Sequence, residues 1–141
     1  MLDKVHDHIL AELGHSARID TIVVVVAIVF DLIALGINAS AAAAAAVDNG
    51  SGLILANLIL VVFLAMTGAF NLIALGGMLL GRSTRSKLLA GMLAMYHDNN
   101  VDQYYDKSLL TNYGLRYLVF GGVILVLAGV AMLVPVFIRF A

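Results

Sequence analysis

The chain has no cysteine and no tryptophan, a single proline, and few charged residues among its 141 positions. The lack of cysteine excludes disulfides, thiolate metal sites and cysteine nucleophiles. Charged residues make up 12% of the sequence, against about a quarter in a soluble domain, so the polar surface is too small to face water on all sides. The net charge of -1, with no basic domain, gives no pull toward nucleic acid.

Apolar residues, in contrast, make up 62% of the chain and form three long runs: Thr21 to Val47, Leu53 to Gly81 and Tyr117 to Ile138. A helix rises about 1.5 Å per residue and the hydrocarbon core of a bilayer is about 30 Å thick, so each run is long enough to cross it. We therefore expect an all-α integral membrane protein with three transmembrane helices. The lipid bilayer is its expected solvent, and residues 1–141 form one membrane domain.

Polar segments separate the runs. Residues 1–20 carry apolar side chains at spacings of three and four, which predicts an amphipathic helix: Leu2, Val5, Ile9 and Leu13. Gly14 is expected to end that helix. The sequence DNGSG is the strongest turn signal and makes 21–81 a two-span hairpin. The connection 82–116 is long enough to predict helical structure of its own. Residues 117–141 form the third span and a short tail.

Basic residues are unevenly distributed between the two sides of the predicted membrane. Seven of the eight lysines and arginines lie before the first span or in the connection 82–116, and only Arg139 lies on the other side. This bias predicts a multi-pass protein of the cell membrane with a cytoplasmic N-terminus and an external C-terminus. The first twenty residues lack a signal-peptide pattern, so the first span is expected to remain as an anchor.

A heptad occurs twice, as FDLIALG from Phe30 and as FNLIALG from Phe70. Six of the seven positions are identical, and the remaining position holds Asp31 in one copy and Asn71 in the other. Both residues lie twenty positions from Ser51, the centre of the predicted turn. Both also lie eleven positions from the cytoplasmic ends of their spans, which is ~16 Å of helix. The two counts predict that Asp31 and Asn71 meet near the middle of the bilayer.

Two interpretations of this pair remain open. A buried Asp–Asn hydrogen bond that holds the hairpin together contributes about 0.6–2 kcal/mol in a membrane. Alternatively, an intramembrane acid without a basic partner marks a pathway for protons or cations. Asn38 and Asn57 are further polar positions inside the spans, and we include them with Asp31 and Asn71 as candidates for such a site.

Small residues recur along the spans and allow helix backbones to approach closely, which is the main attraction between helices in lipid. They predict packing faces, with the lining of a pore as the alternative: Gly36, Gly76, Gly77, Gly81, Gly121 and Gly122. Three spans bury little surface by themselves. We therefore expect self-association or other membrane subunits as partners.

The connection carries acidic residues at every fourth position: Asp98, Asp102 and Asp106. In a helix they would share one face, either as a solvated acidic stripe or as oxygen ligands for a hard cation. One helical stripe rarely surrounds an ion, so we predict no metal site and no cofactor.

No nucleophile–base pair, phosphate-binding loop or zincin motif is present, so the sequence does not predict an enzyme. It predicts a packing or assembly subunit of a homo-oligomer or larger membrane complex. The alternative is a small oligomeric ion channel, or a proton- or ion-coupled transporter, in which Asp31 titrates and Asn71 orients it.

Overall fold

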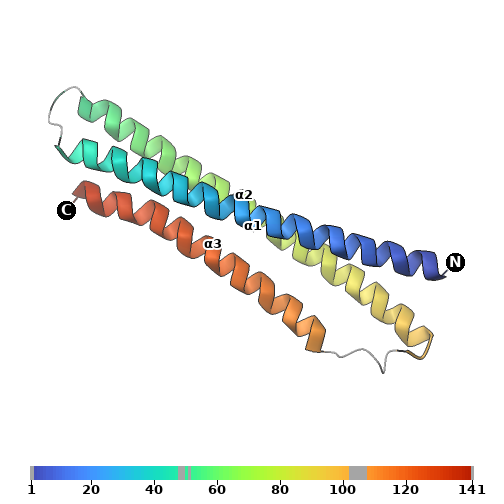
Figure 1. Ribbon diagram of the computed structural model, residues 1–141. Helices are drawn as coiled ribbons and strands as arrows, with labels where there is room; N and C mark the ends of the chain where they lie inside the picture. Colours follow the sequence, from blue (N-terminus) through green and yellow to red (C-terminus); the bar gives the residue numbers. More distant parts are fainter. Residues whose placement is uncertain (1, 48–49, 51, 102–107, 141) are drawn as a thin grey trace.

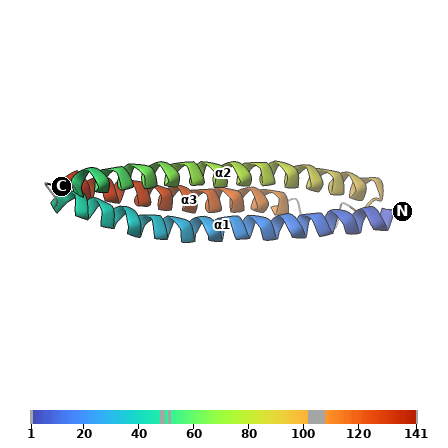
Figure 2. The ribbon, with the colours of Figure 1, turned by 90° about the horizontal axis from the view of Figure 1, so that it is seen from above.

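The computed structural model describes residues 2–47, 50, 52–101 and 108–140. Three long helices account for nearly all of them: α1 (Leu2–Val47), α2 (Gly52–Asp98) and α3 (Ser108–Phe140). They lie along one common direction, with α2 antiparallel to α1 and α3 (Figures 1 and 2). The predicted fold class is confirmed, because the described part of the chain contains no strand and three helices long and apolar enough to cross a membrane.

The helices are longer than the membrane requires. At ~1.5 Å per residue, the 46 residues of α1 and the 47 of α2 extend for ~70 Å, more than twice the thickness of the hydrocarbon core. The predicted spans therefore form only one end of each of these two helices: 21–47 is the C-terminal part of α1, and 53–81 is the N-terminal part of α2. The described part of the connection is helical except at 99–101, because α2 continues through 82–98 and α3 begins at Ser108.

The prediction that Gly14 ends a separate N-terminal helix is wrong. The first twenty residues are continuous with the first span, and α1 runs unbroken through Gly14. A β-carbon added at Gly14 would meet nothing within 4 Å. A glycine in a helix costs only about 1 kcal/mol relative to alanine, and α1 contacts α2 on both sides of Gly14. The rings of His6 and Tyr96 are in contact before it, and Arg85 donates a hydrogen bond to Ser16 after it. This segment therefore packs on another helix of the same chain.

Buried side chains follow a repeat of three and four residues along each helix. On α1 the buried positions are Asp20, Val24, Ala27, Asp31, Ala34, Asn38, Ala42 and Ala45. On α2 they are Leu60, Thr67, Asn71, Ala74, Met78, Arg85, Leu89 and Met92. On α3 they are Tyr117, Ile124, Ala128, Ala131 and Pro135. A spacing that averages 3.5 residues is the repeat of left-handed coiled coils, so each helix buries one narrow seam.

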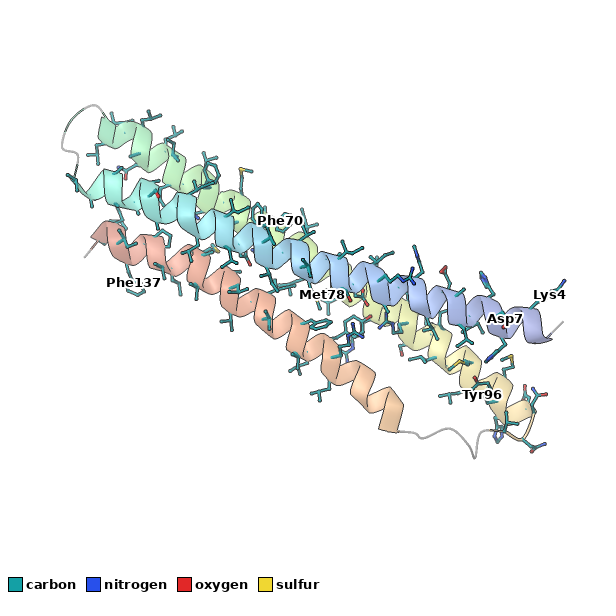
Figure 3. The ribbon with its side chains drawn as sticks, in the orientation of Figure 1. Lys4, Asp7, Phe70, Met78, Tyr96 and Phe137 are labelled. Atoms are coloured by element: carbon teal, nitrogen blue, oxygen red, sulfur yellow. The ribbon has the colours of Figure 1, made fainter. Side chains whose placement is uncertain are left out.

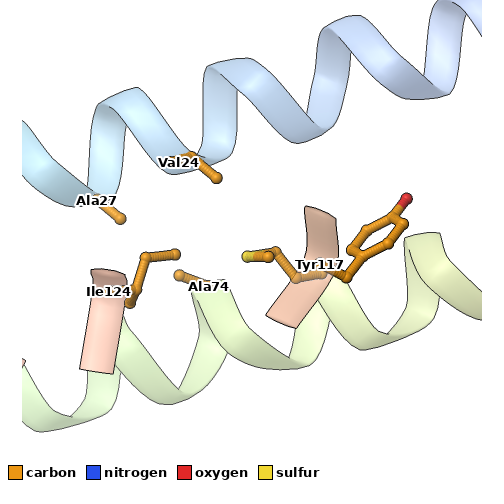
Figure 4. Close-up of a cluster of buried hydrophobic side chains, with 6 residues drawn as sticks. Val24, Ala27, Ala74, Tyr117 and Ile124 are labelled. Carbon is orange, nitrogen blue, oxygen red and sulfur yellow. The ribbon is translucent and has the colours of Figure 1, made fainter. Parts of the chain in front are cut away.

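The centre of the bundle holds a small apolar cluster drawn from all three helices (Figure 4). Val24 and Ala27 of α1 face Ala74 of α2 and Ile124 of α3 in this cluster. Helix α1 contacts both other helices more extensively than α2 and α3 contact each other. Most other apolar side chains point away from the bundle, as the outward sticks in Figure 3 show.

Helix α2 ends at a pair of asparagines. Asn100 adopts a φ of 56°, and its backbone N–H donates to the carbonyl of His97 at 3.0 Å. The N–H of Val101 donates to the carbonyl of Tyr96 at 3.0 Å. This pattern is a Schellman motif, with asparagine in the left-handed position that usually holds glycine. The side chain of Asn99 caps a further carbonyl, that of Met95, at 2.7 Å.

Candidate functional site

Asp31 and Asn71 are in direct contact, as the two counts along the sequence predict. Asn71 Nδ2 donates a hydrogen bond to Asp31 Oδ1 at 2.7 Å and a second one to the carbonyl oxygen of Thr67 at 2.9 Å. Asp31 is 1% exposed and Asn71 is 4% exposed, so both are hidden from the outer surface of the bundle. The pair joins α1 to α2 through their buried seams.

The residues around the pair also come from the two copies of the heptad. The rings of Phe30 and Phe70 stack with their centroids 4.1 Å apart and their planes inclined by 28°. Ala34 and Ala74, which follow at the same position of each copy, are both buried. In an antiparallel hairpin, two identical segments at the same depth are related by an approximate two-fold axis that runs perpendicular to the helices. The two copies of the heptad therefore contact each other in a nearly symmetric way, each with the same residues.

Some buried oxygen atoms near the pair are not hydrogen-bonded. Among the described residues, Asp31 Oδ2, Asn71 Oδ1 and Asn38 Oδ1 have no hydrogen-bond partner. A buried acceptor without a donor typically costs about 1–3 kcal/mol. The carboxyl group therefore has one oxygen held by Asn71 and one that can accept a further donor or carry a proton.

Asn38 lies one heptad beyond Asp31 on the same seam and is linked to the single proline of the chain. Its Nδ2 donates to the carbonyl oxygen of Ala131 at 3.4 Å. That carbonyl would normally bond the backbone N–H four residues later, but position 135 is a proline and has no N–H. Because the bilayer offers no other donor, the side chain of Asn38 replaces the missing backbone bond.

A second buried polar cluster joins all three helices nearer the N-terminal end of α1, and the sequence analysis did not identify it. Arg85 Nη2 of α2 lies 3.1 Å from Asp20 Oδ2 of α1. The hydroxyl of Tyr117 of α3 donates to the same carboxylate oxygen at 2.5 Å. Arg85 also donates to Ser16 Oγ at 3.3 Å. All three principal side chains are buried, so this cluster is a polar junction within the bundle.

The sequence contains a signal for this junction. Arg85 is one of the seven basic residues counted for the orientation, and Tyr117 is the first residue of the third apolar run. Asp20 lies eleven residues before Asp31, and Arg85 lies fourteen residues after Asn71. Separations of eleven and fourteen residues are each made up of successive steps of three and four residues. Asp20 therefore lies on the same buried seam as Asp31, and Arg85 lies on the same seam as Asn71. Extending the seams beyond the spans would have brought the acid and the base together.

Asn57, the remaining polar candidate, lies near the other end of the bundle. Its Oδ1 accepts a hydrogen bond from Arg139 Nε at 3.1 Å, which joins the beginning of α2 to the end of α3. The structure thus does not gather the four polar candidates into one site. Asp31 and Asn71 form a pair, whereas Asn38 and Asn57 each bond α3 at a different level.

The six glycines predicted to form packing faces differ in their surroundings. A β-carbon added at Gly81 would lie 2.8 Å from Asp20 Oδ1, so this glycine allows the carboxylate to lie against α2. One added at Gly121 would meet only the side chain of Leu75, at 3.9 Å. The other four would meet nothing within 4 Å: Gly36, Gly76, Gly77 and Gly122. Within the chain, therefore, only Gly81 takes part in a close contact.

Only the first residue of the acidic stripe lies in the described part of the chain. Asp98 is the last residue of α2, and Asn100 follows it in the left-handed conformation. Asp102 and Asp106 lie outside the described residues. Among the residues that are described, no three histidine, aspartate or glutamate side chains gather closely enough to hold a metal ion.

Comparison with known proteins gives no relative for this chain. No family model, no curated protein and no solved structure matches it. Its function is therefore inferred from the geometry of its own residues.

Proposed function

We propose that the chain is a packing or assembly subunit of a homo-oligomer or of a larger membrane complex. One observation supports this most strongly: each of the four polar candidates in the spans makes a hydrogen bond to another helix of the same chain. In lipid, polar side chains that bond across helices stabilise helix association by about 0.6–2 kcal/mol each. The polar groups of this bundle are thus used to fix the relative positions of its helices.

The outer faces supply the surface for assembly. In the most apolar stretch of each helix, only 28%, 11% and 22% of the residues are buried within the chain, in the order α1, α2 and α3. Gly36 on α1 and Gly76 and Gly77 on α2 lie on these uncovered faces. Because small residues promote close helix contacts in membranes, we propose that these glycines contact a second copy or another subunit.

The proposed setting is the cell membrane, with the N-terminus and the connection between α2 and α3 in the cytoplasm. Arg85 and Arg116 support it, because each bonds a residue of α1 near the predicted beginning of the first span, Asp20 and Thr21 respectively. Basic residues from α2 and α3 are thereby held at the same end of the bundle. Such an excess of positive charge is typical of the cytoplasmic side.

Two substitutions of Asp31 test the proposed structural role. Asp31→Asn keeps an oxygen that accepts from Asn71 but removes the acid, so the fold and the oligomeric state of the parent should persist. Asp31→Leu removes the acceptor as well and leaves the Asn71 amide poorly bonded, which should destabilise the chain by about 1–3 kcal/mol. Oligomeric state is measured by native mass spectrometry and stability by unfolding in mixed micelles. Equal effects of the two substitutions would contradict the proposal.

The second candidate function is a small oligomeric ion channel or a proton- or ion-coupled transporter. The observation in its favour is that Asp31 Oδ2 and Asn71 Oδ1 are buried without a donor among the described residues. An intramembrane carboxyl with a free oxygen is suited to binding a proton or a cation. Liposomes that contain the parent protein and show proton or cation flux, abolished by Asp31→Asn in intact oligomers, would favour this function over assembly.

A further inference from the structure

Two hollows lie between α2 and α3 and meet at shared residues. One, of about 290 Å³, has the polar side chains of Arg82, Arg85 and Ser86 in its lining, together with apolar residues that include Leu89 and Ala90. The other, of about 480 Å³, is mostly apolar and extends from Leu79 along α2 and past Gly122 on α3. Arg82 and Tyr117 line both, so the two hollows form one groove with a polar mouth and an apolar continuation.

The apolar part of the groove exists because α3 lacks side chains where it faces α2. Gly121 and Gly122 line it, and a β-carbon added at Gly122 would meet nothing within 4 Å. Leu79 and Leu118 line the same groove and remain exposed at the surface of the bundle. The groove thus opens toward the hydrocarbon and is chemically suited to an acyl chain.

The polar mouth carries the positive charge of Arg82, for which the described residues supply no ion-pair partner. The charge of Arg85 is matched by Asp20, with which it forms a buried ion pair. Arg82 lines the mouth with an exposed side chain, and Ser86 contributes a hydroxyl group to the same lining. Exposed Arg18 and Arg116 add further positive charge near the same end of the bundle. A cationic pocket between membrane helices is the pattern that binds anionic lipid headgroups.

We propose that the groove between α2 and α3 binds an anionic phospholipid. Its phosphate lies at Arg82 and near the hydroxyl of Ser86, and one acyl chain occupies the hollow over Gly121 and Gly122. A lipid is favoured over a free phosphate because the apolar hollow continues directly from the charged mouth. The site is independent of Asp31 and therefore does not depend on the function proposed for that residue.

Native mass spectrometry of the full chain, released from detergent in the presence of added lipid, tests the site. Phosphatidylglycerol should bind more tightly than phosphatidylcholine with the same acyl chains. Arg82→Gln should weaken phosphatidylglycerol binding about fivefold, the factor that corresponds to about 1 kcal/mol per arginine near a membrane surface. Gly122→Leu fills the hollow and should weaken binding of the same lipid at least as much, with the melting temperature unchanged.

Arg18→Gln is the matched control, because it removes an exposed arginine from the same end of the bundle without lining the groove. If Arg18→Gln weakens binding as much as Arg82→Gln does, the attraction is general and the site is refuted. Displacement of the lipid by an equal concentration of glycerol phosphate would show an anion site without an acyl subsite and would also refute it. If Gly122→Leu fails to fold, the comparison of Arg82→Gln with Arg18→Gln decides.

Discussion

At the scale of single residues, hydrogen bonds and ion pairs between helices offset the cost of placing polar groups inside the bundle. Pro135 removes a backbone donor from α3, and Asn38 of α1 supplies an amide donor in its place. Asp20 brings a carboxylate into the bundle, and Arg85 and Tyr117 bond it from two other helices. The presence of a buried ion pair is weak evidence that it raises the free energy of unfolding. Removing one of its partners, however, lowers that free energy, because the other charge is left buried and unpaired.

The link between Asn38 and Pro135 predicts a coupling that two substitutions can measure. Asn38→Leu should destabilise the parent by about 1–2 kcal/mol, because the carbonyl of Ala131 loses its donor. With Pro135→Ala present, the backbone N–H restored at position 135 bonds that carbonyl within α3, so Asn38→Leu should cost less. Unfolding of the four proteins in mixed micelles gives the coupling free energy. Equal costs of Asn38→Leu in the two backgrounds would show that the bond to Ala131 is unimportant.

At the scale of the helices, a seam with a 3.5-residue repeat determines which groups meet. The seam explains why α1 continues through Gly14, since contacts on both sides of that residue hold one straight helix against α2. The glycines of α2 are of two kinds, those that lie on this seam and those that lie outside it. Gly81 faces Asp20 across the contact between α1 and α2, whereas Gly76 lies outside the seam with nothing within 4 Å of an added β-carbon.

The two kinds of glycine predict different defects. Gly81→Ala should lower the melting temperature of the chain, because the added methyl group displaces the carboxylate of Asp20 from Arg85 and Tyr117. Gly76→Leu should leave the fold of the chain intact and reduce its oligomeric state, measured by native mass spectrometry. Gly91→Leu is the control, since Gly91 is exposed on the same helix beyond the span. An unchanged oligomer in Gly76→Leu would exclude this face as the assembly surface.

At the scale of the whole molecule, the sequence predicts the features that follow from counting residues. The three spans follow from the length of the apolar runs. The contact between Asp31 and Asn71 follows from equal distances to a turn and to the membrane ends. The pair of Asp20 and Arg85 follows from extending the seams of α1 and α2, but the place of Tyr117 in that junction could not be counted, because the long connection leaves its position along α1 undetermined. Only the packing of α3 on the other two helices sets that position.

The contact between the two heptads can be measured by disulfide cross-linking in native membranes. The chain has no cysteine, so introduced thiols are the only ones present. Phe30→Cys combined with Phe70→Cys should form an intramolecular disulfide on mild oxidation, because the two rings stack in the structure. Phe63 lies seven residues from Phe70, which is ~10 Å along the helix, so Phe30→Cys with Phe63→Cys should not cross-link. A cross-link of the second pair in the absence of the first would contradict the account.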